Sequence, residues 1–371
     1  MHSDPMSAAI ALAARGLGAT WPNPSVGCVI VAPDGRILGR GRTATGGRPH
    51  AEIAALAMAG AAARGATAYV TLEPCNHTGR TGPCSEALAV FGIKRAVIAT
   101  LDPNPLVSGN GVARLREAGV EITIGVCEAE ARQLNDAFAK FIQTKTPFVT
   151  LKSALSADGR LAPPATARKT REPHWLTGPA ARAQVQRLRH AYDAILTGIG
   201  TILSDNPAMT DRTGLPRRRP LLRIVVDTML STPMDSQLVN SANNDVLLLH
   251  AADADQTRKR AFTERGLQTA RIHRSDTGGL HLPTIFELLA ERDILSVLAE
   301  TGPRLNGSLL SAGLVDQAVL FYAPVTLGPD ALPFAEDIAS PQAFEKSLQQ
   351  VTRTSFGDDT CVTGYLHNPW A

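Results

Sequence analysis

Short apolar runs alternate with helical patterns along the first 143 residues. Strands are expected at residues 25–32, 36–42, 67–72, 95–100 and 121–125. Helices are expected over 5–15, from His50, from Cys84, near 110–118 and through 128–143. The Asp34-Gly35 pair predicts a turn between the first two strands. This alternation predicts an α/β/α domain.

A new apolar run follows the polar segment Thr144–Pro147 and begins a second α/β unit. Strands are expected at residues 148–156, 194–200, 221–227, 245–251, 294–300 and 317–325. Helices are expected near 178–190, 283–293 and 304–313. Stretches rich in Pro, Gly and Arg at 162–173 and 214–220 predict loops. We therefore expect one domain at 1–146 and a second at 147–371.

Composition excludes several classes of protein. The 371 residues exceed what one core usually carries, so two domains are expected. A net charge of +3 and 5% aromatic residues argue against a nucleic-acid surface. Five scattered cysteines, of which Cys28, Cys127 and Cys361 are expected to be packing residues, predict a reducing, cytoplasmic location. No apolar stretch is long enough for a membrane span, and no basic leader precedes the first apolar run.

Residues 50 to 84 contain the main group of candidate metal-binding and catalytic residues. His50, Cys75 and Cys84 are zinc-ligand residue types, and Glu52 follows the histidine by two positions. Three protein ligands leave one zinc position for water, whose pKa zinc lowers to roughly 7. Because both ligand clusters begin expected helices, exposed N–H groups favour a thiolate there. A carboxylate beside such a metal carries protons in zinc nucleobase deaminases, so we expect one zinc per chain with Glu52 as catalytic residue.

The same residues have simpler explanations. Cysteines in a chain of this size are often buried small hydrophobic residues, and a lone histidine is often a core or surface residue. A structural zinc would need a fourth Cys or His, for which His77, between the two cysteines, is the nearby candidate. The presence of HAE together with a proline before each cysteine favours the catalytic site.

The spacing between the two cysteines distinguishes among the families of zinc deaminases. The residues NHTGRTGP separate Cys75 from Cys84, whereas nucleic-acid and nucleoside deaminases usually carry C-x-x-C. This spacing resembles the deaminase half of the bifunctional riboflavin-biosynthesis deaminase–reductases. Further stretches resemble the same family: WPNPSVGCVIV at 21–31, LDPNPLVSGNG at 101–111, LSADGR at 155–160, HWLTG at 174–178, AILTGIGTILSDNPAMTDR at 194–212 and ETGPRLNGSLLSAGLVDQ at 300–317. The resemblance covers nearly the whole chain in the same order.

The resemblance implies a fold and two reactions. The fold would be a cytidine-deaminase-like α/β/α domain followed by a dihydrofolate-reductase-like α/β domain. The first reaction would be zinc-dependent deamination of 2,5-diamino-6-(5-phosphoribosylamino)pyrimidin-4-one. The second would be NADPH-dependent reduction of the ribose of 5-amino-6-(5-phosphoribosylamino)uracil to a ribityl chain. The partner would be this small phosphorylated pyrimidine rather than nucleic acid or membrane, and a homo-oligomer stays open.

The resemblance also assigns binding residues. For substrate these are Asn23, His77, Arg80, Pro173, Arg189, Met209, Arg212 and Glu300. For NADPH they are Leu155, Trp175, Thr201, Asp205, Thr228, Gly302, Pro303, Arg304, Leu305, Asn306, Gly307 and Ser308. The arginines at 189 and 212 would hold the ribose phosphate, and Asp205 or Glu300 would assist proton transfer.

From its residues alone, the turn at 302–307 is weak evidence for a dinucleotide site. It follows an apolar strand and opens a helix, with glycines at 302 and 307 that would let phosphate approach the backbone. It is not G-x-G-x-x-G, and a plain strand–helix turn explains it as well.

Some residues depart from the family pattern or leave alternatives open. Thr43 stands where many relatives have His, and Pro173 where they usually have Ser. Arg217–Arg219 is either a phosphate patch or a solvated loop. Two other functions stay open: a nucleobase or nucleic-acid deaminase with an accessory C-terminal domain, and a non-catalytic metal-binding protein. The first requires a basic, aromatic surface, and Glu52 argues against the second.

Overall fold

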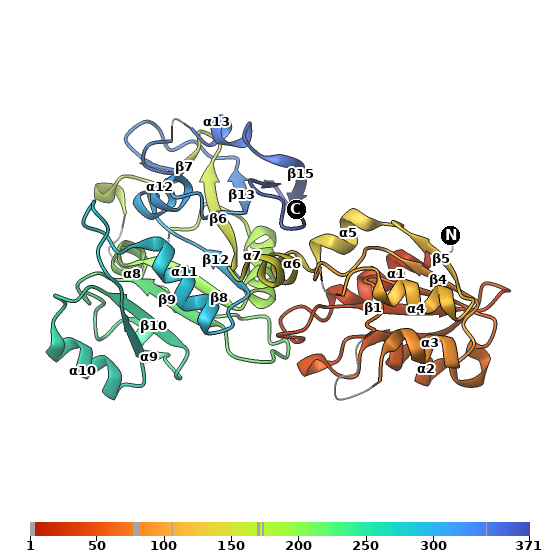
Figure 1. Ribbon diagram of the computed structural model, residues 1–371. Coiled ribbons are helices and arrows are strands. Elements are labelled where there is room, and N and C mark those ends of the chain that lie inside the picture. Colours follow the sequence, from red (N-terminus) through yellow and green to blue (C-terminus); the bar gives the residue numbers. More distant parts are fainter. Residues whose placement is uncertain (1–3, 77–81, 106, 169–170, 173, 339) are drawn as a thin grey trace. The chain divides into compact units, whose positions relative to one another are not determined.

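Figure 1 shows a computed structural model of the chain, which describes residues 4–76, 82–105, 107–168, 171–172, 174–338 and 340–371. The chain forms two compact units. The first contains Met1–Lys145, Pro216–Arg219 and Trp370. The second contains Thr146–Leu215, Pro220–Pro369 and Ala371.

A five-stranded sheet of order β2-β1-β3-β4-β5 forms the centre of the first unit. Its strands are β1 Gly27–Val31, β2 Ile37–Arg42, β3 Thr67–Val70, β4 Arg95–Ile98 and β5 Glu121–Ile124. Its helices are α1 Pro5–Ala14, α2 Ala51–Ala59, α3 Cys84–Val90, α4 Asn110–Glu117, α5 Glu128–Gln133 and α6 Asp136–Thr144. β1 pairs antiparallel with β2 and β3, whereas β3, β4 and β5 run parallel.

Alternate side chains of the sheet point to two separate apolar layers. Cys28 and Ile30 of β1 pack with buried residues of α2, α3 and α4. Val29 and Val31 point the other way and pack with residues of α1 and α5. The first unit is therefore an α/β/α sandwich, as the alternating sequence pattern predicts.

Glycines let the helices lie directly on this sheet. A Cβ at Gly27 would come within 1.9 Å of the Ala9 carbonyl oxygen on α1. A Cβ at Gly41 would come within 2.2 Å of the Ala51 carbonyl oxygen on α2, and Gly39 lies equally close to the same helix. Because any side chain there would push α2 outward, these glycines fix the distance between α2 and β2.

The single helix expected through 128–143 is in fact two, α5 and α6, and that prediction is wrong. Asn135 lies between them with non-helical backbone angles. Its Oδ1 accepts a hydrogen bond from the Ser25 N–H at 2.8 Å, and its Nδ2 donates to the Ser25 carbonyl at 3.1 Å. This tertiary contact outweighs the helical pattern of the segment.

The segment Pro216–Arg219 belongs to the first unit, and its residues 216 and 218 are exposed. The Arg219 guanidinium lies over the Trp21 ring, 3.9 Å from its centroid, and the Arg218 N–H donates to the Gly18 carbonyl at 3.1 Å.

The second unit is built on a nine-stranded sheet of order β11-β10-β9-β8-β12-β6-β13-β16-β15. The strands of this unit are β6 Phe148–Ser156, β7 Arg160–Ala162, β8 Ala194–Gly198, β9 Leu222–Val226, β10 Val246–His250, β11 Gln268–Arg271, β12 Ser296–Ala299, β13 Gln317–Ala323, β14 Leu332–Pro333, β15 Gln349–Phe356 and β16 Asp359–Tyr365. The helices are α7 Pro179–Ala191, α8 Ile199–Asp205, α9 Gln237–Asn240, α10 Gln256–Glu264, α11 Leu282–Glu291, α12 Pro303–Ser311 and α13 Pro341–Glu345. β7 and β14 form a separate two-stranded ribbon.

Helices cover both faces of this sheet. Residues of α11 and α12 pack on one apolar layer with Leu247 and Leu249 of β10. Residues of α8, α9 and α10 pack with Leu248 on the opposite face, and α7 packs with Val319 and Phe321 of β13. The strands from β11 to β13 run parallel, and β16 and β15 extend the sheet antiparallel. The predicted α/β class is therefore confirmed for both units. Among the described residues, no helix is both long and apolar enough to cross a bilayer.

We expect Gly41→Ala to loosen the first unit, because its methyl group would meet helix backbone that cannot move aside cheaply. The free energy of local opening of β2 should fall by about 3 kcal/mol, at the upper end of overpacking costs. Hydrogen exchange of peptides covering β1 and β2 measures this quantity. Gly82→Ala is the matched control, because a Cβ there meets nothing within 4 Å. Unchanged exchange in Gly41→Ala would contradict the close packing of α2.

Candidate functional site

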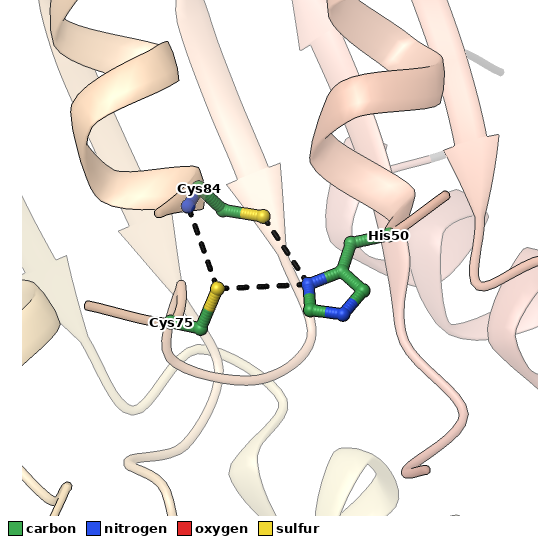
Figure 2. A group of neighbouring side chains, drawn as sticks. All are labelled: His50, Cys75 and Cys84. Atoms are coloured by element: carbon green, nitrogen blue, oxygen red, sulfur yellow. Dashed lines mark hydrogen bonds between the residues drawn. The ribbon is translucent and has the colours of Figure 1, made fainter. Parts of the chain in front are cut away.

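Two helix N-termini bring the expected metal ligands together in the first unit. His50 is the residue that precedes α2, and Cys84 is the first residue of α3. Figure 2 shows both cysteine sulfurs facing the His50 ring, with Nδ1 at 3.6 Å from Cys75 Sγ and 3.3 Å from Cys84 Sγ. One ligand atom from each residue lies within 4.8 Å of the others. A nitrogen and two sulfurs so arranged form a donor set that zinc prefers.

The hydrogen bonds among these side chains make the two thiols unequal. The Cys84 thiol and the His50 ring lower the pKa of Cys75 to about 4. The same contact with Cys75, together with burial, raises the pKa of Cys84. The Cys84 N–H, at the start of α3, donates to Cys75 Sγ at 3.4 Å. The N-terminus of α3 therefore stabilises a thiolate at Cys75, the form that binds metal.

Glu52 lies in the first turn of α2 and is only 3% exposed. Burial raises the pKa of its carboxyl group to about 7. A carboxyl group that is half protonated near neutral pH can both accept and release a proton, as general acid–base chemistry requires.

The carboxylate of Glu73 joins the ligand loop to a second loop, a contact that the sequence interpretation missed. Its Oε2 accepts hydrogen bonds from the N–H groups of Asp102 and Gly109, at 3.2 and 2.9 Å. Its Oε1 accepts from the Val112 N–H at 3.0 Å. A Cβ at Gly111 would come within 2.0 Å of the Pro74 carbonyl. The available signal was the position of Glu73, directly before Pro74 and Cys75.

Of the other residues discussed for this site, the structure describes Asn23 and Thr43. Asn23 packs against Gly47, where a Cβ would come within 1.9 Å of Asn23 Nδ2. Thr43 is buried, and its Oγ1 accepts a hydrogen bond from the Val26 N–H at 3.0 Å. The Thr43 hydroxyl is thus engaged by the sheet. His77 and Arg80 lie outside the described residues, as does Pro173 of the second unit.

A cavity of about 1590 Å³ opens at the carboxyl ends of the parallel strands of the second unit. Open α/β sheets usually bind ligands at this edge. The predicted residues that line the cavity are Trp175, Arg189, Thr201, Asp205, Met209, Arg212, Thr228, Glu300, Gly302, Pro303, Arg304, Leu305, Gly307 and Ser308. The sequence motifs from which they were predicted thus converge on one site.

Glu300 is a buried anion between two cations at the cavity wall. Arg189 donates to it through Nε at 2.7 Å and Nη2 at 3.1 Å, and Lys152 Nζ lies 3.5 Å away. Burial would raise the pKa of Glu300, but the two cations outweigh it and lower the pKa to about 2. Lys152 was not predicted, although a lysine within the apolar run of β6 was a signal for it.

The structure does not support side-chain contacts with a ligand for Asn306 and Leu155. Asn306 is fully buried. Its Nδ2 donates to the Phe334 carbonyl at 2.7 Å, and its Oδ1 accepts a hydrogen bond from the Thr301 hydroxyl. The Leu155 side chain is fully buried in the core. Neither residue lines the cavity.

Gly302 and Gly307 play different parts. A Cβ at Gly302 would meet nothing within 4 Å, whereas one at Gly307 would come within 2.5 Å of the Glu336 carbonyl oxygen. Gly307 is thus needed for the packing of α12. This packing accounts for the glycine without any need for a bound phosphate.

The main chain of β6 is open towards the cavity. β6 pairs with β12 only as far as Leu151 and Ala299, but with β13 as far as Ser156. The Phe148 N–H donates to the Leu295 carbonyl on the β12 side, whereas the Val149 carbonyl accepts from the Asp316 N–H on the β13 side. Because peptide groups alternate along a strand, Ala154 turns its N–H and C=O towards the β12 side, beyond the last described pair. Ala154, which lines the cavity, therefore offers a main-chain donor and acceptor to a ligand.

Comparison with known proteins places both units in families. Residues 1–100 match the cytidine and deoxycytidylate deaminase zinc-binding region, and residues 147–362 match the RibD C-terminal domain. The riboflavin biosynthesis protein RibD of Escherichia coli is 41% identical over 96% of this chain and 97% of its own length.

Solved structures agree with the sequence match over the full length. The Acinetobacter baumannii RibD structure, form 1, is 36% identical with a TM-score of 0.80 and covers 97% of both chains. A Thermotoga maritima diaminohydroxyphosphoribosylaminopyrimidine deaminase/5-amino-6-(5-phosphoribosylamino)uracil reductase is 32% identical with a TM-score of 0.79, again over 97% of both chains. With a deaminase-type ligand set in one unit and a reductase-type cavity in the other, the chain belongs to the RibD family of bifunctional riboflavin-biosynthesis enzymes.

Proposed function

We propose that each unit carries out one of the two reactions, the first with one zinc ion and the second with NADPH. The first unit deaminates 2,5-diamino-6-(5-phosphoribosylamino)pyrimidin-4-one, and the second reduces the ribose of the product, 5-amino-6-(5-phosphoribosylamino)uracil. The observation that carries the proposal is the convergence of His50, Cys75 and Cys84, with the buried Glu52 in side-chain contact with Cys84. Full-length incubation with the first substrate, with and without NADPH, and the mass of the products test the proposal as a whole.

In the first unit the chain needs to hold the metal and move protons. His50 Nδ1 and the two sulfurs fit zinc, which would supply a water of lowered pKa. Glu52 then accepts a proton at its carboxylate and delivers it to the ring nitrogen, and a second proton accompanies the departing ammonia. Asn23, His77 and Arg80 are proposed to bind the pyrimidine and its phosphate.

In the second unit the size and position of the cavity support NADPH and substrate side by side. Single ligand sites usually measure about 300–1,000 Å³, and this cavity is larger. The first turn of α12, after Gly302, presents main-chain N–H groups without helical partners, which suits a pyrophosphate. NADPH would supply a hydride. Ala154 and the cavity residues predicted for NADPH would position the cofactor: Trp175, Thr201, Asp205, Thr228, Gly302, Pro303, Arg304, Leu305, Gly307 and Ser308.

The charges beside Glu300 argue against this residue, one of the two expected proton donors, as the acid. Because the pKa of Glu300 is lowered to about 2, this carboxylate is ionised at neutral pH and positions cations rather than donating a proton. The Lys152 ammonium, 3.5 Å from Glu300, is the acid we propose for the sugar oxygen as the ring opens. Arg189 and Arg212 are proposed to bind the phosphate.

The partner we propose is therefore a small phosphorylated pyrimidine rather than a nucleic acid or a membrane. All five cysteines are free, which supports a reducing, cytoplasmic location.

The metal proposal predicts about one zinc per chain in the purified protein. Cys75→Ala combined with Cys84→Ala should remove it, because a lone histidine binds zinc poorly. Elemental analysis measures both. Cys127→Ser is the matched control, since Cys127 is a free cysteine outside the ligand set. Full zinc retention in the double variant, or no transition metal in the parent, would refute the assignment.

Glu52→Gln keeps the shape of the side chain but removes its ability to take up a proton. Ammonia release should fall by at least about 10²-fold, while zinc content and reduction of the deaminated intermediate survive. Glu86→Gln is a close control, because Glu86 follows Cys84 as Glu52 follows His50 but is exposed on α3. A deamination rate near that of the parent would show that Glu52 is not the proton carrier.

Gly302→Val should raise the KM for NADPH by at least about tenfold, because a branched side chain would project where the pyrophosphate is proposed to bind. The fold should tolerate it, since a Cβ at Gly302 meets nothing within 4 Å. Deamination should be unaffected. Gly307→Val provides the contrast, because its Cβ would collide with Glu336 and should lower thermal stability. The assignment of α12 fails if Gly302→Val folds normally and its KM for NADPH is unchanged.

A further inference from the structure

The loop that follows α8, residues 206–213, carries three cavity residues, Pro207, Met209 and Arg212. Neighbouring elements bind both its main chain and its side chains. Arg223, which is 1% exposed, donates through Nη1 to the Ala208 carbonyl at 2.8 Å. Asn206 accepts a hydrogen bond from the Gln237 N–H at 2.8 Å. The loop is therefore anchored at its start, and its second half is bound by a different element.

Helix α7 binds the second half of the loop through three residues of one face. Arg189 Nη1 donates to the Thr210 carbonyl at 3.2 Å. His190 Nδ1 lies 2.8 Å from Asp211 Oδ2. Gln186 Oε1 accepts a hydrogen bond from the Arg212 N–H at 2.9 Å. Positions 186, 189 and 190 share one side of a helix, so one rigid element binds three consecutive loop residues.

The pair of His190 and Asp211 is the buried centre of this contact. Their side chains are 9% and 8% exposed. The other carboxylate oxygen, Asp211 Oδ1, accepts hydrogen bonds from the Thr213 N–H and hydroxyl at 2.9 and 2.8 Å. Burial would raise the pKa of Asp211, but the bonds from Thr213 and His190 outweigh it and lower the pKa. A buried carboxylate so bonded has little freedom to shift, because each lost bond costs its desolvation.

We propose that Asp211 and His190 are positioning residues for substrate binding, which act by fixing the main chain of Arg212 so that its guanidinium meets the substrate phosphate. The inference rests on the proposed role of Arg212. A merely structural role for the pair would lower stability and affect all kinetic constants alike. A positioning role would raise only the KM for the phosphorylated substrate.

The test uses the full-length protein, the deaminated substrate and NADPH. Asp211→Asn should raise the KM for substrate about tenfold, the worth of a hydrogen bond to a charged group. The kcat, the KM for NADPH and deamination should stay within about twofold of the parent. Asp235→Asn is the matched control, because Asp235 pairs with Arg171 at 2.7 Å but is exposed and does not line the cavity. It should leave every constant unchanged.

A double-mutant cycle separates this inference from the proposed function. In an Arg212→Ala background, Asp211→Asn should add nothing further to the KM, because its effect passes through Arg212. An equal effect of Asp211→Asn with and without Arg212 would overturn the inference. If Arg212→Ala raises the KM but Asp211→Asn does not, the inference fails while the proposed phosphate contact of Arg212 stands. If Arg212→Ala has no effect, the proposed phosphate contact fails with it.

His190 keeps the proposal testable should Asp211→Asn fold poorly. His190→Ala should raise the KM for substrate as Asp211→Asn does. His190→Asn, whose amide places a donor close to the position of Nδ1, should restore it. Equal KM values for the parent and a well-folded His190→Ala would overturn the inference.

Discussion

Helix α2 lies against β2 with no side chain between their backbones at Gly39 and Gly41, and this contact decides where His50 stands. His50 ends the segment that leads from β2 into α2, so a shift of the helix would carry the ring with it. Cys84 is placed in the same way by α3, which packs on the same face of the sheet. The ligand set thus depends on helix–sheet distances as well as on its own residues. A metal there would join the two helix N-termini and the Cys75 loop.

The second unit depends on a different constraint, the cost of burying charge. Glu300, Arg189 and Lys152 lie together where β12 ends beside the middle of β6, with side chains that are mostly buried. A buried ion pair contributes little net stability against apolar residues of the same size, whereas breaking it is costly. Such a group is better explained by chemistry at the cavity than by folding. It also connects α7, which carries Arg189, to the strand end where the sugar would be reduced.

The sequence predicted most of the strands that face a core, although it missed the largely buried β16. It also failed where tertiary contacts or exposure decide. Apolar runs identified β1, β6, β8, β9, β10, β12 and β13, because each is buried on both faces. β15 was not predicted, since the run QQVTRTSF is almost wholly exposed and carries no apolar periodicity. Asn135 interrupts a helical pattern through bonds to Ser25, more than a hundred residues earlier, which no local window contains. Among site residues, spacing identified the metal ligands because metal chemistry restricts residue type. It did not show that the Asn306 side chain is buried, because a loop pattern does not reveal which side chains turn inward.

The early end of the pairing between β6 and β12 gives the second unit an incomplete sheet. A ligand with a planar amide would bond the peptide groups at Ala154 much as an added strand would. With such a ligand, cofactor occupancy and resistance to unfolding would be linked, because the ligand would bind only the folded sheet. At a cofactor concentration one hundred times its Kd, this linkage is worth about 2.7 kcal/mol. The free cofactor concentration relative to its Kd would therefore set the stability of this half of the protein as well as its rate.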